Sequence, residues 1–574
     1  MADVRHNRPD QNRVQELMRP ADQVMRLARM GASHQTRLSF MRAILRRVKS
    51  EGWQVERTVW NVDDKGVGVG VYEARGPERT YSLIAYANDL PPEKRSDRVI
   101  ATEWDASFAL FDGVPTEADI ERLRNNVPKQ EAGRCSASEL VLSRANRSVR
   151  LFDHVVDRLA AGQQPDRAEL DKVGYLMRTT AVYGNGKFGL SDRAKYAARA
   201  EAGGPFRVEL LAVWLIRAFT VDVVEHMAWV KGGDKAVRMD KALRRRLGVG
   251  NSTGLGMAPF LVNHPALLNA WITARETALA RVRALPSAAV ATIARFEELV
   301  ARAHAGLERW HTPDERQARR VCELAGDFGK LKVQAKTGVL QQADPWNSLY
   351  LWAQANLTLE GVEAVVSLII EPHSELVDDL AGQMAADETE IFLIDGRMSV
   401  GGLAAQAREQ FKWAMDTDFA SHDETARFWY VSEEKLEPRL GERHEEDGAE
   451  LEQRLGIGRD VKALVEGLES VPGNMLVAEF LLAHPQHRLA ARRVQLASSL
   501  PYTEIHDNVL SATMMPIDML RCKLAFFGAS RFDPKSDRWV RITMYSDAPF
   551  PDEIAGMDAD DWAWPPLDMA VSPA

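Results

Sequence analysis

The sequence predicts an α+β fold that is predominantly helical, with a small N-terminal antiparallel sheet module, a large helical core and a C-terminal α/β part. Three observations predict this class. Alternating apolar residues and turn residues indicate strands between 53 and 112, helical spacing dominates from there to about 385, and strand-like runs then return. Because 574 residues exceed what one hydrophobic core serves, roughly two to four domains are expected.

The first part of the chain divides into a polar lead at residues 1–22 and an α/β sheet module at residues 23–114. Apolar residues recur at helical spacing from Gln23 to Val48, and the period changes at Trp53. After the turn signal at residues 63–66, valines alternate with glycines as in a hairpin. Further strands are expected at 80–87 and within 98–111.

Residues 115–385 are expected to form the helical core. Pro115-Thr116-Glu117 begins the first helix with favourable capping residues. Helices are predicted at 138–161, 167–180, 206–230, 265–285, 288–310 and 349–370. Residues 210–224 are apolar around most of the helix circumference, which indicates a helix buried inside a bundle.

The C-terminal α/β part is expected at residues 386–548, with strands at 390–395, 427–432 and 538–545. An irregular tail rich in Pro, Asp and Trp follows at 549–574. Arg246-Leu247-Gly248-Val249-Gly250 also recurs as Arg454-Leu455-Gly456-Ile457-Gly458, and the run at 260–265 resembles that at 480–485. An internal duplication and a chance similarity both stay open.

Charge and cysteine usage limit the class of protein. The net charge is −9, and basic residues are interspersed with acidic ones, so neither nucleic acid nor a membrane surface is an expected partner. Three scattered cysteines and the lack of a CxxC pair argue against a disulfide scaffold. The N-terminus has no apolar signal core, and no run is long enough to span a bilayer. We therefore expect a soluble cytoplasmic protein.

A glycine-rich run at 248–256 is the strongest candidate site. Glycines let backbone N–H groups turn inward, so the run suits a nest for a carboxylate, phosphate or oxyanion, with Asn251, Ser252 and Thr253 as substrate-binding contacts. It fits neither a P-loop nor the dinucleotide fingerprint. The alternative is a tight turn between helices. His264, shortly after the run, is a secondary acid–base candidate.

The segment from Gly256 to Pro265, Gly-Met-Ala-Pro-Phe-Leu-Val-Asn-His-Pro, resembles the signature loop of the fumarase and argininosuccinate-lyase families. The resemblance covers only this segment, and the lysine that those families carry there is missing. It implies elimination chemistry as one reaction class to consider.

A second candidate lies at 178–189, where a predicted helix runs into glycines that flank Asn185 and Lys187. Tyr183 and Lys187 are candidates for proton transfer, with Asn185 and Arg178 as substrate-binding residues. The alternative is a helix end with a solvated lysine.

Arg144 and Arg147, three apart on the helix predicted at 138–161, would share a face and form a fork for an anion. The alternative is that both arginines pair with acidic residues of a neighbouring helix.

No metal site or hydrolase motif is predicted. Local clusters such as Glu225-His226 and His484/His487 lack the spacing that places two imidazoles on one helix face. No Gly-x-Ser-x-Gly elbow is present.

The sequence thus predicts an enzyme, lyase-like, that acts on a small anionic metabolite bearing a carboxylate or phosphate, by addition or elimination. Two glycine-rich segments, distant in the chain, would converge on this ligand. The sequence names no cofactor, and a flavin- or nucleotide-dependent enzyme is one alternative. A non-catalytic helical scaffold is the other, and a homo-oligomer is possible.

Overall fold

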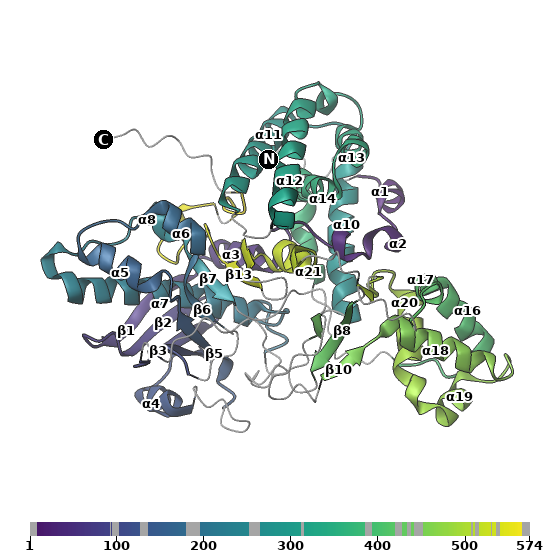
Figure 1. The fold of residues 1–574 in the computed structure, drawn as a ribbon, viewed down its shortest axis with the longest axis horizontal. Coiled ribbons are helices and arrows are strands. Elements are labelled where there is room, and N and C mark those ends of the chain that lie inside the picture. Colours follow the sequence, from purple (N-terminus) through teal and green to yellow (C-terminus); the bar gives the residue numbers. More distant parts are fainter. Residues whose placement is uncertain are drawn as a thin grey trace. The chain divides into compact units, whose positions relative to one another are not determined.

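The computed structural model describes residues 9–91, 93, 103–126, 136–179, 196–251, 264–310, 315–384, 393–419, 427–432, 438–440, 452–506, 509–510, 516–529, 531–534, 540–558 and 560–564. The chain forms two compact units. Unit 1 comprises Met1–Ala32, Leu255–Leu285 and Glu375–Cys522, and unit 2 comprises Ser33–Gly254, Pro286–Ser374 and Lys523–Ala574. The predicted mixed α+β class with a majority of helix is confirmed (Figure 1).

Unit 2 contains a nine-stranded sheet with the order β1-β2-β3-β4-β5-β6-β7-β13-β12. Its strands are β1 (Gln54–Val62), β2 (Gly68–Arg75), β3 (Thr80–Ala87), β4 (Ala106–Asp112), β5 (Glu139–Arg147), β6 (Tyr175–Thr179), β7 (Gly248–Asn251), β12 (Arg531–Pro534) and β13 (Val540–Met544). The strands β1 to β6 form an antiparallel meander. Only β6 and β7 pair in parallel among these strands.

The helix α7 (Arg207–Gly232) connects the parallel pair and packs across one face of the sheet, from β3 to β7. Phe219 of α7 meets three aromatic rings of the strands, those of Trp60, Tyr72 and Phe108. Sixteen residues of this helix are buried, which agrees with its apolar sequence. The buried helix predicted at 206–230 is thus confirmed, but the predicted bundle around it is wrong, because α7 packs across a sheet.

The opposite face of the sheet is covered by α4 (Glu117–Asn126). Its Leu123 belongs to a buried cluster with alternate residues of β2 to β5, among them Val71, Ile84 and Leu142. Alternation along the strands therefore separates an α7 face from an α4 face.

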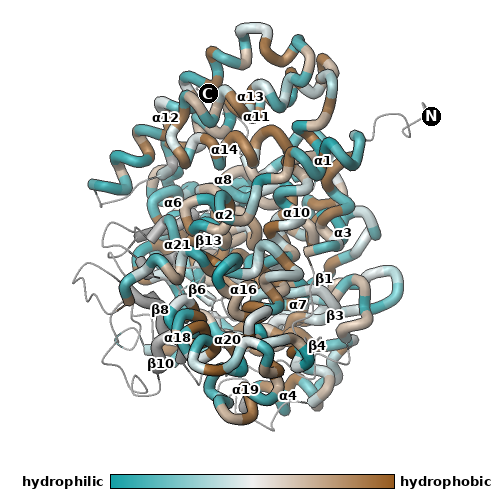
Figure 2. The backbone as a smooth tube through the Cα atoms, turned by 90° about the vertical axis from the view of Figure 1, so that its right-hand side faces the viewer, coloured by the Kyte–Doolittle hydropathy of each residue, from teal (hydrophilic) through white to brown (hydrophobic). Residues whose placement is uncertain are grey.

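The remaining helices of unit 2 are α3 (Phe40–Ser50), α5 (Phe152–Ala160), α6 (Arg167–Val173), α8 (Lys241–Arg246), α11 (Val290–Gly306), α12 (Glu315–Ala335), α13 (Pro345–Asn356) and α14 (Leu359–Ile370). The last four pack on one another. Figure 2 shows α14 mostly in the colour of apolar residues and α12 with many polar ones, as expected of a central helix and an outer helix.

Unit 1 is mostly helical, with α1 (Gln11–Leu17), α2 (Ala21–Val24), α10 (Pro265–Arg283), α16 (Val400–Gln410), α17 (Lys412–Met415), α18 (Ile457–Glu469), α19 (Val477–Ala483), α20 (Arg488–Ser499) and α21 (Pro516–Cys522). A small sheet joins β8 (Arg427–Ser432), β9 (Pro438–Leu440), β10 (Glu452–Leu455) and β11 (Val509–Leu510). A buried pair of Arg19 and Glu276, bonded at 2.7 and 2.8 Å, fixes the N-terminal segment to α10.

Residues 545–564, where described, run without long elements over unit 2. Their carboxylates pair with arginines from other parts of the unit, Asp552 with Arg244 at 2.7 Å and Asp560 with Arg42 at 3.2 Å. Arg217, buried in α7, donates to the carbonyl oxygens of Leu247 and Ala548. The segment is therefore held by ion pairs and backbone contacts.

Three helix predictions are wrong. The helix predicted at 349–370 is two helices, α13 and α14, which are separated at Leu357 and Thr358. The helix predicted at 138–161 is strand β5 followed by α5, and the one predicted at 167–180 is α6 followed by β6. Gly174 ends α6 in a left-handed conformation (φ 80°), which lets the chain turn directly into β6. The strand predicted at 427–432 is β8, whereas the one predicted at 538–545 is β13 of the nine-stranded sheet.

No helix within the described ranges is both long enough and apolar enough to cross a membrane.

Candidate functional site

The parallel pairing of β6 and β7 brings the two predicted anion-binding segments to one edge. Thr179 is the Cα partner of Asn251, and each is the last residue of its strand. Because the two strands are parallel, their carboxyl ends lie side by side here. We call this place, with Arg144, Arg178 and Asn251, the β6–β7 edge. The candidates Tyr183, Asn185, Lys187, Ser252 and Thr253 follow the two strands and lie outside the described residues.

Arg144 and Arg178 lie on the same face of the sheet. Asn146 of β5 is the partner of Arg178, and Arg144 lies two residues before Asn146, so the two arginines are diagonal neighbours on the α4 face. Arg147, three residues from Arg144, points to the α7 face. The predicted fork of Arg144 and Arg147 is therefore wrong, because it assumed a helix where the chain forms a strand.

The guanidinium of Arg144 lies 3.7 Å from the ring centroid of Trp104, which is a cation–π contact. Burial lowers the pKa of Arg144 to about 10. A cation that is desolvated to this degree is stabilised by any anion that reaches it.

Arg147 and Asp105 form part of the sheet framework. Asp105 is 1% exposed, and its carboxylate accepts from the backbone N–H of Arg147 at 2.9 Å. The backbone N–H of Asp105 donates to the side-chain oxygen of Asn146. Arg147 also lies 4.5 Å from the ring centroid of Phe152. These contacts stabilise the local packing of β5.

Two glycines of the run at 248–256 are required by packing. A Cβ on Gly248 would overlap the carbonyl oxygen of Met544, and a Cβ on Gly250 would lie 2.8 Å from the ring of Tyr175. Asn251 is fully buried and donates to the Thr179 carbonyl at 3.4 Å. The described half of the run is thus a strand in a close-packed sheet, and the predicted turn between helices does not occur there.

His264 lies in unit 1, directly before α10, whereas the arginines lie in unit 2. Its backbone angles (φ −130°, ψ 62°) nearly equal those of His484 (φ −127°, ψ 64°), so the two His-Pro pairs share a local geometry. The glycine motifs do not: Arg246–Gly250 passes from α8 into β7, and Arg454–Gly458 passes from β10 into α18.

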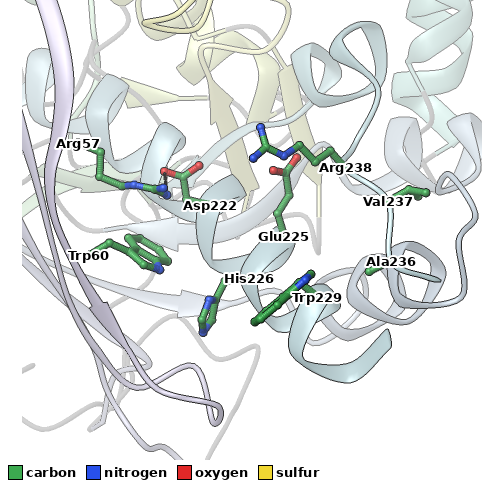
Figure 3. Close-up of a pocket in the computed structure, with 9 residues that line it drawn as sticks. All are labelled: Arg57, Trp60, Asp222, Glu225, His226, Trp229, Ala236, Val237 and Arg238. Atoms are coloured by element: carbon green, nitrogen blue, oxygen red, sulfur yellow. Dashed lines mark ion pairs between the residues drawn. The ribbon is translucent and has the colours of Figure 1, made fainter. Parts of the chain in front are cut away.

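Sequence analysis missed a pocket of about 460 Å³ between β1, α7 and the loop after α7 (Figure 3). It is lined by Arg57, Trp60, Asp222, Glu225, His226, Trp229, Ala236, Val237 and Arg238, and we call it the β1–α7 pocket. A signal existed in the sequence, since polar and aromatic residues stand at 222, 225, 226 and 229, the spacing of one helix face. Among the described residues, no group of three or more His, Cys, Asp or Glu side chains is placed to hold a metal ion.

Comparison with known proteins identifies no relative: no protein-family model, curated protein or solved structure matches this chain.

Proposed function

We propose that this protein is an enzyme that binds a small anionic metabolite, bearing a carboxylate or a phosphate, at the β6–β7 edge. The parallel pairing of Thr179 with Asn251 carries the proposal, because both glycine-rich segments start from that one edge. In sheets with parallel strands, ligands commonly bind beyond the carboxyl ends, where the strand connections diverge. The pairs β4–β5, β5–β6 and β7–β13 are antiparallel, so β6 and β7 are, among the described strands of this sheet, the neighbours whose carboxyl ends lie side by side.

Charge at this edge supports an anion. Arg144 and Arg178 project from neighbouring strands on one face, and a guanidinium presents paired donors that match a carboxylate or phosphate. Arg178 is 7% exposed, so its charge acts in a medium that screens it weakly.

The chemistry proposed for the edge is addition or elimination beside a carboxylate. Lys187 and Tyr183 would transfer the proton, while Asn185, Ser252 and Thr253 would orient the substrate. His264, which lies in unit 1, stays an acid–base candidate of the sequence and is not part of this proposed site. A cytoplasmic location and a homo-oligomeric state stay predictions of the sequence.

The test is thermal unfolding of the whole chain with phosphate, succinate and fumarate, compared between wild type and the variants Arg178→Lys, Lys187→Ala and Ser252→Ala. Arg75→Lys, on β2 of the same sheet, is the matched control because Arg75 is half exposed and pairs with Glu73. We expect at least one anion to raise the melting temperature of wild type and the control, and to lose this effect in the three variants.

If no anion shifts the melting temperature, or if the three variants respond as wild type does, the proposal is wrong. An ultraviolet–visible spectrum of the purified protein tests the cofactor alternative, because flavin absorbance would identify the protein as a flavin-dependent enzyme.

One observation favours the scaffold alternative. Gly248 and Gly250 are explained by packing against Met544 and Tyr175 and need no ligand. If Ser252→Ala and Lys187→Ala change the free energy of unfolding but no ligand response, the glycine-rich segments act as packing elements only.

A further inference from the structure

The β1–α7 pocket is built from two elements that are far apart in the chain. On α7, Asp222, Glu225, His226 and Trp229 lie on one face, because they are three, four and seven residues apart. On the edge strand β1, Arg57 and Trp60 point to the same pocket.

A bulge in β1 aligns these two side chains. Arg57 pairs with Tyr72 and Val59 pairs with Val71, so Thr58 is an extra residue in β1. Without the bulge, residues three apart on a strand would point to opposite faces. Gly70, the partner of Trp60, completes the arrangement, since a Cβ there would lie 3.1 Å from the indole ring. The indole therefore packs closely over Gly70 of β2.

Contacts with neighbouring side chains fix the position of the carboxylate of Asp222 in the pocket. Arg57 Nη1 lies 2.9 Å from Asp222 Oδ2, and the buried Tyr72 hydroxyl donates to the same oxygen at 2.6 Å. Both contacts use Oδ2. Among the contacts of the described residues, none uses Asp222 Oδ1, so this oxygen can accept a hydrogen bond from a ligand.

Glu225 and His226 are positioned in a similar way. Glu225 Oε1 accepts from the backbone N–H of Met239 at 3.1 Å, and burial raises the pKa of this carboxyl. His226 Nε2 lies 3.0 Å from the carbonyl oxygen of Asp63 and donates to it. In the neutral ring this makes Nδ1 an acceptor.

The charges of the pocket balance, and its aromatic surface is exposed. Two arginines, Arg57 and Arg238, face two carboxylates, Asp222 and Glu225 (Figure 3). Trp229 is 61% exposed, which is unusual for an indole on a helix. A balanced set of charges favours neither an anionic nor a cationic ligand, whereas an exposed ring favours one with an apolar face.

We propose that the β1–α7 pocket binds one or two rings of a neutral saccharide. A sugar ring has an apolar C–H face that stacks on an indole, and its vicinal hydroxyls both donate and accept hydrogen bonds. Trp229 provides the stacking surface, Asp222 Oδ1 and His226 Nδ1 accept, and Arg238 donates. The volume of about 460 Å³ lies within the range of small-ligand pockets, about 300–1,000 Å³. This site is separate from the β6–β7 edge.

Saturation-transfer NMR on the whole chain tests the proposal. The probes are methyl glucoside, methyl galactoside, methyl mannoside, N-acetylglucosamine, maltose and cellobiose, with adenosine as a planar ligand and benzamidine as a cationic one. We expect at least one saccharide to receive saturation at its ring C–H protons. Trp229→Ala and Asp222→Asn should each weaken that binding roughly tenfold or more.

Two matched controls should bind the saccharide as wild type does: Trp352→Ala on α13, and Asp157→Asn on α5, whose carboxylate is 58% exposed. Trp229 is exposed, so its variant is expected to fold even if Asp222→Asn does not. The proposal is wrong if no saccharide binds, or if Trp229→Ala binds the saccharide as tightly as wild type does. It is also wrong if adenosine or benzamidine binds in place of every saccharide. Arg178→Lys, which tests the anion site, should leave saccharide binding unchanged.

Discussion

The β6–β7 edge and the β1–α7 pocket lie on the same sheet but differ in the charged side chains that they carry. At the edge, Arg144 and Arg178 place two cations on one face, and burial lowers the pKa of Arg144. In the pocket, Arg57 is paired with Asp222 and the indole of Trp229 is 61% exposed. This difference is why we propose an anionic ligand at the edge and a neutral ligand in the pocket, and each prediction below separates the two proposals.

The largest expected effect concerns Gly248, which belongs to the packing of the edge. Gly248→Ala would place a Cβ against the Met544 carbonyl in the adjacent strand, so we expect a loss of about 3 kcal/mol in the free energy of unfolding, measured with urea. Gly326→Ala is the control, because a Cβ in that part of α12 meets nothing within 4 Å. It should stabilise the protein by up to about 1 kcal/mol. Equal effects of the two changes would contradict the packing assignment.

A smaller effect of opposite sign is expected for Arg144. Arg144→Met removes a desolvated charge and keeps an apolar stem, so the free energy of unfolding should rise by about 1 kcal/mol, after allowance for solvent screening and for the lost contact with Trp104. Anion affinity should fall roughly tenfold.

The pH dependence of the Arg144 effect follows from its pKa. A base whose folded pKa is lowered to about 10 from 12.5 destabilises the fold while it is charged, and this cost is relieved only as pH rises through about 10. The stability difference between wild type and Arg144→Met should therefore be equal at pH 7 and pH 9. A variant less stable than wild type would show that Arg144 has a structural role.

Glu225 gives the pocket a pH dependence in the acidic range, whereas that of Arg144 lies near pH 10. Burial raises the pKa of this carboxyl above 4.5, so its contribution to stability is present at low pH and is lost as pH rises through the raised pKa. In Glu225→Gln, the free energy of unfolding should therefore fall less between pH 4 and pH 7 than it does in wild type. An unchanged profile would mean that the carboxyl is hydrated in the folded protein.

The smallest effect on the free energy of unfolding is expected for Trp229→Ala. Because the side chain is 61% exposed, Trp229→Ala should change the free energy of unfolding by less than about 0.5 kcal/mol while weakening saccharide binding roughly tenfold or more. A large destabilisation would identify the indole as a packing residue and would remove the main support for the saccharide proposal.

Local patterns predicted much of the fold. Four or five strands are expected between 53 and 112, and the structure has β1, β2, β3 and β4 there; the apolar run at 206–230 corresponds to α7. The strand β5 was missed because it is buried on both faces: Leu140, Val141 and Leu142 are consecutive, so no alternation distinguishes it from a buried helix.

The site depended on this missed strand. On a helix Arg144 would share a face with Arg147, but on β5 it shares one with Arg178 of the next strand. The α7 side of the β1–α7 pocket has a signal in the sequence, but the complete pocket could not be predicted, because it depends on the packing of β1 against α7, more than a hundred positions away in the chain.

The most direct test of the central claim is isothermal titration of fumarate and phosphate into wild type, Arg178→Lys, Lys187→Ala and Ser252→Ala. If residues from both glycine-rich segments and from β6 hold one anion, each variant should bind it roughly tenfold more weakly, with an unchanged free energy of unfolding for the Lys187 and Ser252 variants. Full affinity in Arg178→Lys together with Lys187→Ala would contradict the claim that the carboxyl ends of β6 and β7 form an anion site.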